Sequence, residues 1–374
     1  MIYFDYAANT PALAEVLERF LLVERNFLGN PNSSHEIGRY ARLEMTKIVE
    51  HMAKLLGVHS GEIIFTSGAS EANNLAMYGI AHSASHCGRH IISTALEHSS
   101  ISSCLTILEK QGFEIDFVDL DENGLVKLDH LKQLLRNDTI LVAVCSVDSE
   151  IGCIQPIDKI SDILKAYPNC HFHVDATQSL GKIDVSFEGI DTVSFTGHKF
   201  YGLNGCGVLL KRSKRVMEPL IHGGASTTIY RGGTPTLALA AATETALEIA
   251  LAEQQNRYEI VQKMNVKLRR GLEAYTNVQI NSPIGNAIPH ILNVSIKGVK
   301  GTVFQRHLDE QGVCVSVKSA CATNTQYSTS VYAMTKDQRR ALSSWRISLS
   351  HLTTEENVEK FFHAFDVCYQ TLVK

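Results

Sequence analysis

The chain has 374 residues, of which 44% are hydrophobic and 20% are charged, with 25 glycines and 8 prolines. At roughly 150 residues per domain, this length indicates two or three domains or one enzyme-sized unit, and the composition excludes a disordered or collagen-like chain. The 35 basic and 39 acidic residues give a formal net charge of -4, which is not the footprint of a protein that binds nucleic acid or an anionic membrane. We therefore expect no nucleic-acid or membrane partner and a ligand held in a defined site.

The apolar runs and the cysteines bear on the location of the protein. The longest alanine- and leucine-rich run, residues 237–252, contains two threonines and two glutamates, whereas a membrane span needs about 20 mostly apolar residues. The N-terminus lacks a basic start followed by an apolar stretch, so we expect no secretory signal. Nine cysteines are scattered without a C-x-x-C pair, which argues against a disulfide framework or a zinc site. These features favour a reducing, cytoplasmic location and no metal.

Short apolar runs alternate with helical patterns over the first two hundred residues, an order typical of a parallel sheet with crossover helices. The expected strands are 62–66, 90–94, 114–118, 140–146, 171–174, 192–196 and 208–211. The expected helices are 39–56, 69–81, 99–111, 128–135 and 157–166. This order predicts an α/β fold with a mostly parallel seven-stranded sheet.

From residue 234 the pattern changes to a long helical stretch that ends near residue 275. The elements expected after it are strands at 291–296, 313–317 and 346–349 and helices near 302–311 and from 355. We predict a large domain of residues 12–250 and a smaller α+β domain of residues 1–11 and 251–374, with the long helix as the joint between them.

Polar residues follow the ends of several expected strands, which is where ligands bind in an open parallel sheet. The turn from Ser67 to Glu71 opens a helix, so its backbone N–H groups either hold a phosphate or only cap the helix. His98 follows the next strand and is either a site residue or a helix-start histidine without a ligand. Asp175 follows a further strand, where it is structural, a metal ligand or the counter-ion of a cofactor.

Lys199 follows another strand, among small and aromatic residues in the segment 194–202. A lysine is rarely buried without a partner, so Lys199 is either an amine nucleophile directed into a cleft or a surface lysine. A phosphate-binding turn, Asp175 and, about two dozen residues later, a lysine together indicate pyridoxal 5'-phosphate (PLP). In that chemistry the lysine bonds to the cofactor and the aspartate keeps the pyridine nitrogen protonated.

Eleven motifs extend this pattern in order along nearly the whole chain. They are YFDYAANTP (3–11), GNPNSSH (29–35), FTSGASEANN (65–74), EH (97–98), EIG (150–152), HVDATQ (173–178), TGHKFYG (196–202), RGGT (231–234), SAC (319–321), RIS (346–348) and TTEE (353–356). Together they resemble the motifs of the cysteine desulfurases. The resemblance implies the fold-type I architecture of PLP-dependent transferases and a homodimer with its active sites at the subunit interface.

The resemblance also implies roles for single residues. Lys199 would be the Schiff-base lysine, Asp175 the partner of the pyridine nitrogen, His98 the residue stacked on the ring, and Gln178 a donor to the ring oxygen. The residues implied to hold the phosphate are Ala69, Ser70, Thr196 and His198, with Thr234 from the other subunit. Arg346 would bind the substrate carboxylate, with Asn30 near it.

Three departures from the family pattern affect the contacts to the cofactor or substrate. Asp148 and Ser149 stand where the family has paired asparagines, so Ser149 is carried over as a cofactor-binding position with an altered contact. Lys318 stands where the family often has glycine, and the segment 225–230 replaces the usual His-Glu-Arg stretch. These changes affect substrate preference and rate rather than the use of PLP.

Cys321 is the predicted sulfur-accepting nucleophile. A cysteine is more often a small buried residue than a nucleophile, but the segment 319–325 is small and polar, as exposed loops are. Exposure is what a sulfur carrier requires, because its thiolate must reach the substrate and then deliver the sulfur elsewhere. Cys314 alternates with valines, so we expect it in a strand of the core.

We therefore predict a PLP-dependent cysteine desulfurase that converts L-cysteine to L-alanine. Lys199 would move the α-proton, His98 would carry a proton as the sulfur leaves, and Cys321 would hold the sulfur as a persulfide. A sulfur-acceptor protein of iron-sulfur cluster assembly or tRNA thiolation would receive it. The alternatives are a selenocysteine lyase, another class V aminotransferase, or a non-catalytic protein that kept the fold.

Overall fold

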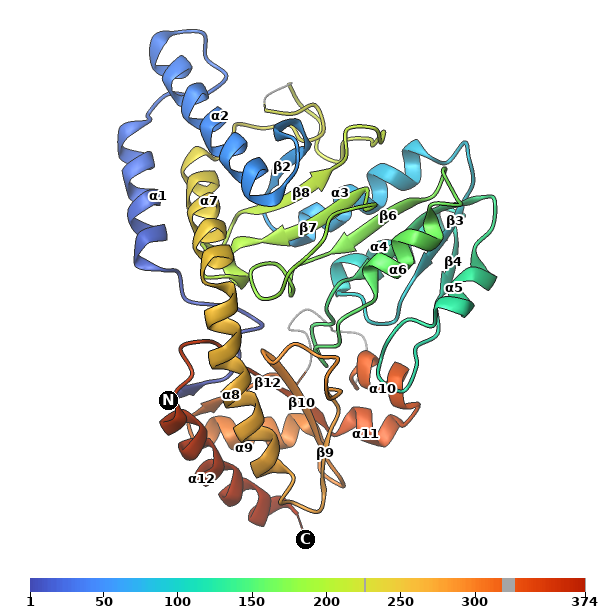
Figure 1. The fold of residues 1–374 in the computed structure, drawn as a ribbon, viewed down its shortest axis with the longest axis vertical. Helices are drawn as coiled ribbons and strands as arrows, with labels where there is room; N and C mark the ends of the chain where they lie inside the picture. Colours follow the sequence, from blue (N-terminus) through green and yellow to red (C-terminus); the bar gives the residue numbers. More distant parts are fainter. Residues whose placement is uncertain (225–226, 318–326, 374) are drawn as a thin grey trace.

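The computed structural model describes residues 1–224, 227–317 and 327–373 (Figure 1). Its larger part is built on a seven-stranded sheet with the strand order β2-β8-β7-β6-β5-β3-β4. The strands are β2 (Ile63–Thr66), β3 (His90–Ser93), β4 (Glu114–Phe117), β5 (Thr139–Cys145), β6 (His171–Asp175), β7 (Thr192–Thr196) and β8 (Gly207–Lys211). Neighbouring strands from β4 to β7 are parallel, whereas β8 is antiparallel to both β7 and β2. The predicted α/β fold with a mostly parallel sheet is confirmed.

Successive residues of these strands face two different hydrophobic clusters. Ile63 of β2 and Val142 of β5 belong to one cluster, whereas Ile64 and Leu141 belong to the other. Because strand side chains alternate between the two faces, the sheet is buried on both sides. One face is covered by α3 (Ala69–Ser83) and α4 (Ser99–Lys110). The other face is covered by α1 (Ala14–Asn26), α2 (Glu36–Leu56), α5 (Leu128–Leu134), α6 (Ile157–Leu164) and α7 (Leu237–Ala252).

The smaller part of the molecule contains both termini (Figure 1). Its strands are β12 (Ser344–Ser348), β10 (Ile291–Ile296) and β9 (Val278–Ile280), paired antiparallel in that order, and β1 (Ile2–Tyr3), which pairs parallel with β11 (Val313–Cys314). Its helices are α8 (Gln254–Leu272), α9 (Gly301–Glu310), α10 (Thr329–Thr335), α11 (Gln338–Leu342) and α12 (Glu355–Leu372). A separate hydrophobic cluster around Phe4, Trp345 and Phe361 holds this part together.

Two expectations for the C-terminal half are corrected. The helical stretch expected from 234 to about 275 is two helices, α7 and α8, with Glu253 between them. The strand expected at 313–317 is a two-residue strand followed by an isolated bridge from Ser316 to Arg346, and Cys314 is half-buried instead of in the core. The reason is that β11 pairs on one side only, with β1.

The predicted domain boundaries remain a prediction. The cluster around Trp345 draws its residues from 2–4 and 261–368, in line with the predicted smaller domain. Val331 and Ala333 of α10 pack instead with the cluster of the large sheet, so contacts cross the predicted boundary.

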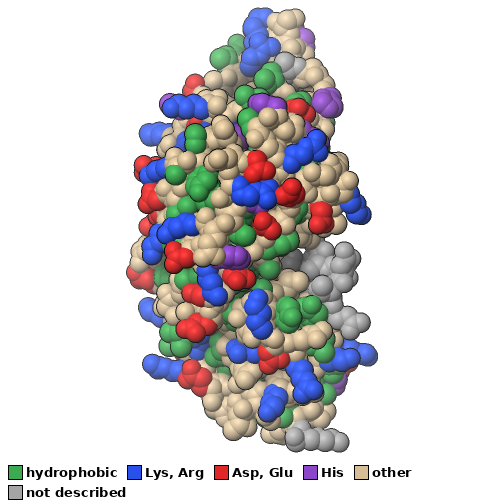
Figure 2. Space-filling view, turned by 90° about the vertical axis from the view of Figure 1, so that its right-hand side faces the viewer, with side chains coloured by type: hydrophobic (Ala, Val, Ile, Leu, Met, Phe, Trp, Pro, Cys, Tyr) green, Lys and Arg blue, Asp and Glu red, His purple; other side chains and the backbone are tan. Residues whose placement is uncertain are grey.

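No helix in the described ranges is both long enough and apolar enough to cross a membrane. In the described part of the face drawn in Figure 2, Lys and Arg side chains are interspersed with Asp and Glu side chains, and no large area carries one sign of charge. This mixed pattern agrees with the net charge of -4.

Candidate functional site

Ten of the predicted site residues line one cavity of about 420 Å³. The cavity lies where the carboxyl ends of the parallel strands meet β12 and the N-terminal segment, including Ala7 and Ala8. The ten residues are Ala69, Ser70, His98, Ser149, Asp175, Gln178, Thr196, His198, Lys199 and Arg346. Ser149 and residues from five separate motifs, up to 277 positions apart (346 minus 69), are therefore brought together.

Asp175 ends β6, and its carboxylate is 5% exposed. Its Oδ2 accepts a hydrogen bond from Asn73 Nδ2 at 2.8 Å, and its Oδ1 accepts one from Thr177 N at 2.9 Å. The Asn73 amide oxygen is held in turn by His173 Nε2, at 3.0 Å, and by Ser194 Oγ. This buried network fixes the carboxylate at the cavity wall. Asn73 was not among the predicted site residues, although it lies within one of the motifs.

His98 caps the N-terminus of α4, where its Nδ1 accepts a hydrogen bond from Ser100 N at 3.2 Å. Burial lowers the pKa of His98, the charge of Asp175 opposes this shift, and the charge of Lys199 adds to it. The imidazole is therefore neutral at neutral pH, with its proton on Nε2, because Nδ1 acts as an acceptor. A neutral ring can lie flat against an aromatic cofactor and still exchange a proton.

Lys199 ends a single 3-10 turn, Gly197–Lys199, directly after β7. Its Nζ donates to the carbonyl oxygens of Ala7, at 2.8 Å, and Ala8, at 2.6 Å. The amine is thus directed into the cavity and oriented by the N-terminal segment.

The backbone around this lysine is held by residues distant in the sequence. Tyr201 has a left-handed conformation with φ of 71°, which is uncommon for a residue other than glycine. Its N–H donates to Thr10 Oγ1 at 2.7 Å, and the same hydroxyl donates to the carbonyl of His198 at 2.9 Å. Ser350 Oγ lies 2.6 Å from the Tyr201 hydroxyl. These contacts stabilise a turn that would otherwise be strained.

The N-terminus of α3 offers an anion site at the edge of the cavity. The first hydrogen bond at this end joins Ala72 N to Gly68 O, so the N–H groups of Ala69, Ser70 and Glu71 remain available. A Cβ at Gly207 would lie 2.3 Å from the Gly68 carbonyl carbon, so a glycine is needed there for β8 to lie against this turn.

Thr196 and His198 form the neighbouring wall. His198 Nδ1 lies 3.1 Å from Thr196 Oγ1, which also donates to the carbonyl of Cys206 at 2.8 Å. Burial, followed by the charge of Lys199, lowers the pKa of His198 to about 4. His198 is therefore a neutral hydrogen-bonding group at neutral pH.

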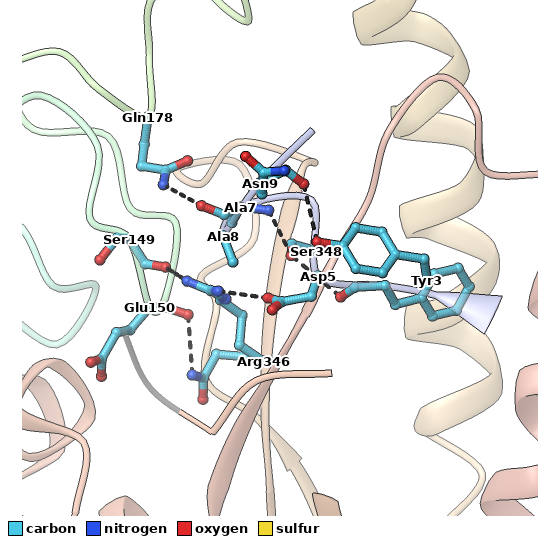
Figure 3. A network of polar contacts seen from close by, with 12 residues as sticks. Tyr3, Asp5, Ala7, Ala8, Asn9, Ser149, Glu150, Gln178, Arg346 and Ser348 are labelled. Atoms are coloured by element: carbon cyan, nitrogen blue, oxygen red, sulfur yellow. Dashed lines mark hydrogen bonds and ion pairs between the residues drawn. The ribbon is translucent and has the colours of Figure 1, made fainter. Parts of the chain in front are cut away.

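Arg346 lies on β12 at the opposite side of the cavity and is 2% exposed. Its Nη1 donates to the carbonyl of Ser149 at 2.6 Å, and its Nη2 forms an ion pair with Asp5 Oδ1 at 2.8 Å (Figure 3). Its Nε is buried without a hydrogen-bond partner among the described residues. Such an N–H is costly to leave unpaired, so it is a ready donor for an incoming carboxylate. Asp5 was not predicted, because only the fold shows that it faces Arg346.

Asp148, one of the departures from the family pattern, is buried near the cavity and does not line it. Its side chain accepts hydrogen bonds from Glu150 N, at 2.9 Å, and from Ser330 Oγ, at 2.8 Å. Burial, followed by the charge of Glu150, raises its pKa to about 6. Asp148 thus stabilises the turn in which the Ser149 carbonyl accepts the hydrogen bond from Arg346.

Three predicted site residues do not line this cavity. Asn30 is exposed in the segment between α1 and α2, which lies far from β12 in Figure 1, so it is not near Arg346 within one chain. Thr234 is exposed and lies outside its own chain's cavity, as expected for a residue predicted to serve the other subunit. Cys321 lies outside the described residues.

Cys145 at the end of β5 also lines the cavity, a position that the motifs do not reveal. It is 4% exposed, and burial raises the pKa of its thiol well above the usual value. The thiol therefore stays protonated, which makes it a poor nucleophile.

The described residues of the cavity fit PLP. The volume lies within the range of roughly 300–1,000 Å³ that small-molecule sites occupy. The N-terminus of α3 suits a phosphate, Asp175 suits a protonated ring nitrogen, and Lys199 supplies an amine. The Thr177 hydroxyl, also at the cavity, is buried without a partner among the described residues.

Comparisons with known proteins agree with this geometry. The family model for class V aminotransferases matches residues 2–361. A NifS/IcsS protein homolog from Lactobacillus delbrueckii subsp. bulgaricus is 37% identical, over 100% of this chain and 98% of that protein. The cysteine desulfurase IscS from Dictyoglomus turgidum is 38% identical, over 96% of this chain and 91% of its own length. The solved structure of a NifS-like protein matches with a TM-score of 0.93 at 34% identity and covers 99% of this chain and 100% of that chain.

Glu97 allows a test of the electrostatics behind the cavity. Burial raises the pKa of this carboxyl to about 8, although two hydrogen bonds, from Thr94 and Cys145, oppose the shift. The Oε2 atom of Glu97 has no partner among the described residues. Because the pKa is raised in the folded protein, the protonated Glu97 stabilises the fold fully below the unfolded-state pKa of about 4.5. This contribution to the free energy of unfolding is lost as the pH rises through about 8. Glu97→Gln should therefore lose less stability than the wild type between pH 5 and pH 9. Urea unfolding at both pH values measures this, with the exposed Glu109→Gln as the control. Equal pH dependence in wild type and Glu97→Gln contradicts a protonated Glu97.

Proposed function

The chain belongs to the class V aminotransferase family and, within it, to the cysteine desulfurases, and we propose that it carries out this reaction with PLP bound in the cavity around Lys199. The observation that supports this site best is the convergence of an amine, a buried carboxylate, a helix N-terminus and an unpaired arginine N–H on one cavity. The overall conversion turns L-cysteine and an enzyme thiol into L-alanine and an enzyme persulfide.

The residues that line the cavity would contact different groups of the cofactor. Lys199 would bond to the cofactor, Asp175 would pair with its ring nitrogen, and Gln178 would donate to its ring oxygen. The phosphate would lie at Ala69 and Ser70, with Thr196 and His198 beside it. When bound, PLP supplies a ring that accepts the electron pair left by removal of the substrate α-proton.

Arg346 would bind the substrate carboxylate through its unpaired Nε–H, and Asp5 and the Ser149 carbonyl would keep the guanidinium in place. This contact orients the α-hydrogen toward Lys199, whose Nζ would take the proton. The neutral His98 would exchange a proton through its Nε2 as the sulfur leaves.

Cys321 would attack the substrate sulfur as a thiolate. A sulfur–sulfur bond forms, the carbon–sulfur bond of the substrate breaks, and protonation of the carbon gives alanine. Reach supports this role: the backbone of Ser316, five residues earlier, is hydrogen-bonded to the backbone of Arg346 at 2.6 and 3.2 Å. At about 3.5 Å per residue, five residues span up to roughly 17 Å, enough to bring the sulfur to the substrate.

The sulfur would then pass to an acceptor protein, as iron-sulfur cluster assembly and tRNA thiolation both require. We further propose a cytoplasmic location. The eight described cysteines are all free thiols, which suits a reducing compartment.

We also propose a homodimer with shared sites. Helices α1 and α2 expose an apolar face that no described residue of the same chain covers, and an apolar surface of this kind marks an interface. Its members and their exposures are Leu17 (44%), Leu21 (47%), Leu22 (52%), Ile37 (53%), Tyr40 (58%) and Leu43 (59%). A second copy on this face would bring partner residues toward the cavity, in line with the exposed Asn30 and Thr234 that their own cavity does not use.

Arg346→Lys should raise the KM for L-cysteine by about 10- to 100-fold while PLP stays bound. The change keeps the charge beside Asp5 but removes the Nε–H, and one charge-assisted hydrogen bond contributes about 1.5–3 kcal/mol. Steady-state kinetics and the visible absorption of the protein measure both effects. Arg340→Lys, at a half-buried arginine that binds Asn281 outside the cavity, is the control. An unchanged KM places the carboxylate elsewhere.

Cys321→Ser should bind PLP and L-cysteine normally but release almost no alanine, because the sulfur has no acceptor. Mass spectrometry of the wild type treated with L-cysteine should find added sulfur on the peptide that contains Cys321. Cys314→Ser, at the nearest described cysteine, should keep the wild-type rate. Alanine release by Cys321→Ser near the wild-type rate rules out the persulfide route through this residue.

Leu43→Glu should convert the dimer to monomers that retain PLP poorly. The residue is 59% exposed in one chain, so the charge leaves the monomer fold intact and is buried only against a partner. Analytical ultracentrifugation and bound-PLP absorbance test this, with Leu352→Glu, at an exposed leucine of the smaller part, as the control. A wild-type monomer with stoichiometric PLP contradicts the shared sites.

A further inference from the structure

A second lysine lies behind the cavity wall that carries Gln178, and the proposed reaction does not use it. Lys182 is 8% exposed, and its Nζ donates to Gln178 Oε1 at 2.7 Å. Backbone hydrogen bonds from Leu180 N to Ala176 O and from Lys182 N to Ser179 O form a helical turn. Because residues four apart lie on one side of such a turn, the fold places the ammonium group directly against the Gln178 amide.

The surroundings of Lys182 are cationic. Burial, followed by the charges of Lys199 and Arg346, lowers the pKa of Lys182 to about 7, and no carboxylate contributes to the shift. Lys182 in turn lowers the pKa of His290 and of His198. Within the described ranges Lys182 forms no ion pair, so the charged form of this buried amine lacks the carboxylate partner that it normally requires.

Lys182 and Lys199 also share a small internal cavity. Its volume is about 10 Å³, close to that of a single water molecule. The other titratable groups that line it are Tyr6, Tyr201, Arg257 and His290. The two lysine side chains therefore border one small space, which apolar residues such as Phe200 and Leu349 also line.

We propose, on the basis of the proposed function, that Lys182 is a positioning residue with two effects on the cofactor site. Its hydrogen bond fixes the Gln178 amide with Nε2 toward the cavity, and its ammonium charge favours loss of the proton from Lys199 Nζ.

The first effect follows from the two ends of the amide. Oε1 accepts a hydrogen bond from Lys182. Nε2 donates to the Ala7 carbonyl at 3.0 Å, as Figure 3 shows. An amide nitrogen carries two hydrogens, so one N–H of Gln178 remains for an oxygen of the cofactor. Without Lys182, Oε1 would be buried without a hydrogen-bond donor, and the contact that holds the amide in this orientation would be lost.

The second effect follows from the clustering of like charges. Two nearby ammonium groups disfavour each other, so a charged Lys182 promotes the neutral amine that Lys199 needs to take a proton. A bound phosphate and a substrate carboxylate bring negative charge to the same region. The anionic ligands thus supply the compensation that this chain's own carboxylates do not give to Lys182.

The test compares PLP-loaded wild type with Lys182→Met, Lys182→Arg and Lys211→Met. Lys211 is a matched control, because it is 3% exposed on β8 and contacts Tyr230 outside the cavity. The two measurements are the pH midpoint of the visible absorption change, which reports the proton on the Lys199 nitrogen, and the dissociation constant of PLP.

Lys182→Met should move the pH midpoint upward by about one unit and weaken PLP binding by about three- to tenfold. Lys182→Arg should restore most of the midpoint, because it keeps the charge, and Lys211→Met should match the wild type. If the Met variant does not fold, Lys182→Gln removes the same charge and carries the same expected upward shift.

A folded, uncharged Lys182 variant with the wild-type midpoint and PLP affinity overturns the inference. The wild-type protein separates this result from failure of the proposed function. If the wild type binds PLP on Lys199 and makes alanine, only the role of Lys182 is wrong. If it does neither, the proposed function itself fails.

Discussion

Burial of the large sheet on both faces is the constraint on which the rest of the structure depends. Ile63 and Ile64, neighbours in β2, already face different hydrophobic clusters, so packed side chains cover both faces of the sheet. The polar side chains that line the cavity from these strands lie at the strand ends, where Asp175 ends β6 and Lys199 follows β7. Three further parts of the chain then close this edge: the N-terminal segment, β12 and the turn around Ser149.

The N-terminal segment connects the two sides of the cavity. Its carbonyl groups at Ala7 and Ala8 accept hydrogen bonds from Lys199. Asp5 of the same segment pairs with Arg346, as Figure 3 shows. The Lys199 amine and the Arg346 guanidinium are therefore both held in position by residues 5–8. A shift of this segment would move both groups together and preserve their relative geometry.

Most of the sheet and the helices can be predicted from the sequence. Strands buried on both faces appear as short apolar runs, and the crossover helices between them show apolar residues at helical spacing. The failures have local causes. In α1 only Val16 and Val23 are buried while several leucines are exposed, so its apolar pattern does not mark a single inward face. Strand β9 has three residues, too few for an alternation to be recognised. In β11 the alternation of valines continues beyond the two residues that find a partner strand.

For the candidate site as well, some residues could be predicted from the sequence and others could not. Residues that carry their chemistry in a motif, such as Lys199 and Asp175, could be predicted from the sequence. Their partners could not, because the hydrogen bond between Asn73 and Asp175 spans 102 positions and the pair of Asp5 with Arg346 spans 341. Lys182 was missed for a related reason: a lysine in a helical turn looks exposed until the fold covers it.

The pairing of β1 with β11 has a consequence for the order in which the chain is made. Residues 2–5 are synthesised early, yet their partners lie at 313–314 and 346–348 and are synthesised much later. The large sheet, whose strands all precede residue 212, can assemble while the N-terminal segment is still unpaired. The cavity therefore gains Arg346 only after the whole large sheet has been synthesised, so a ligand that contacts both Lys199 and Arg346 meets its complete site only then.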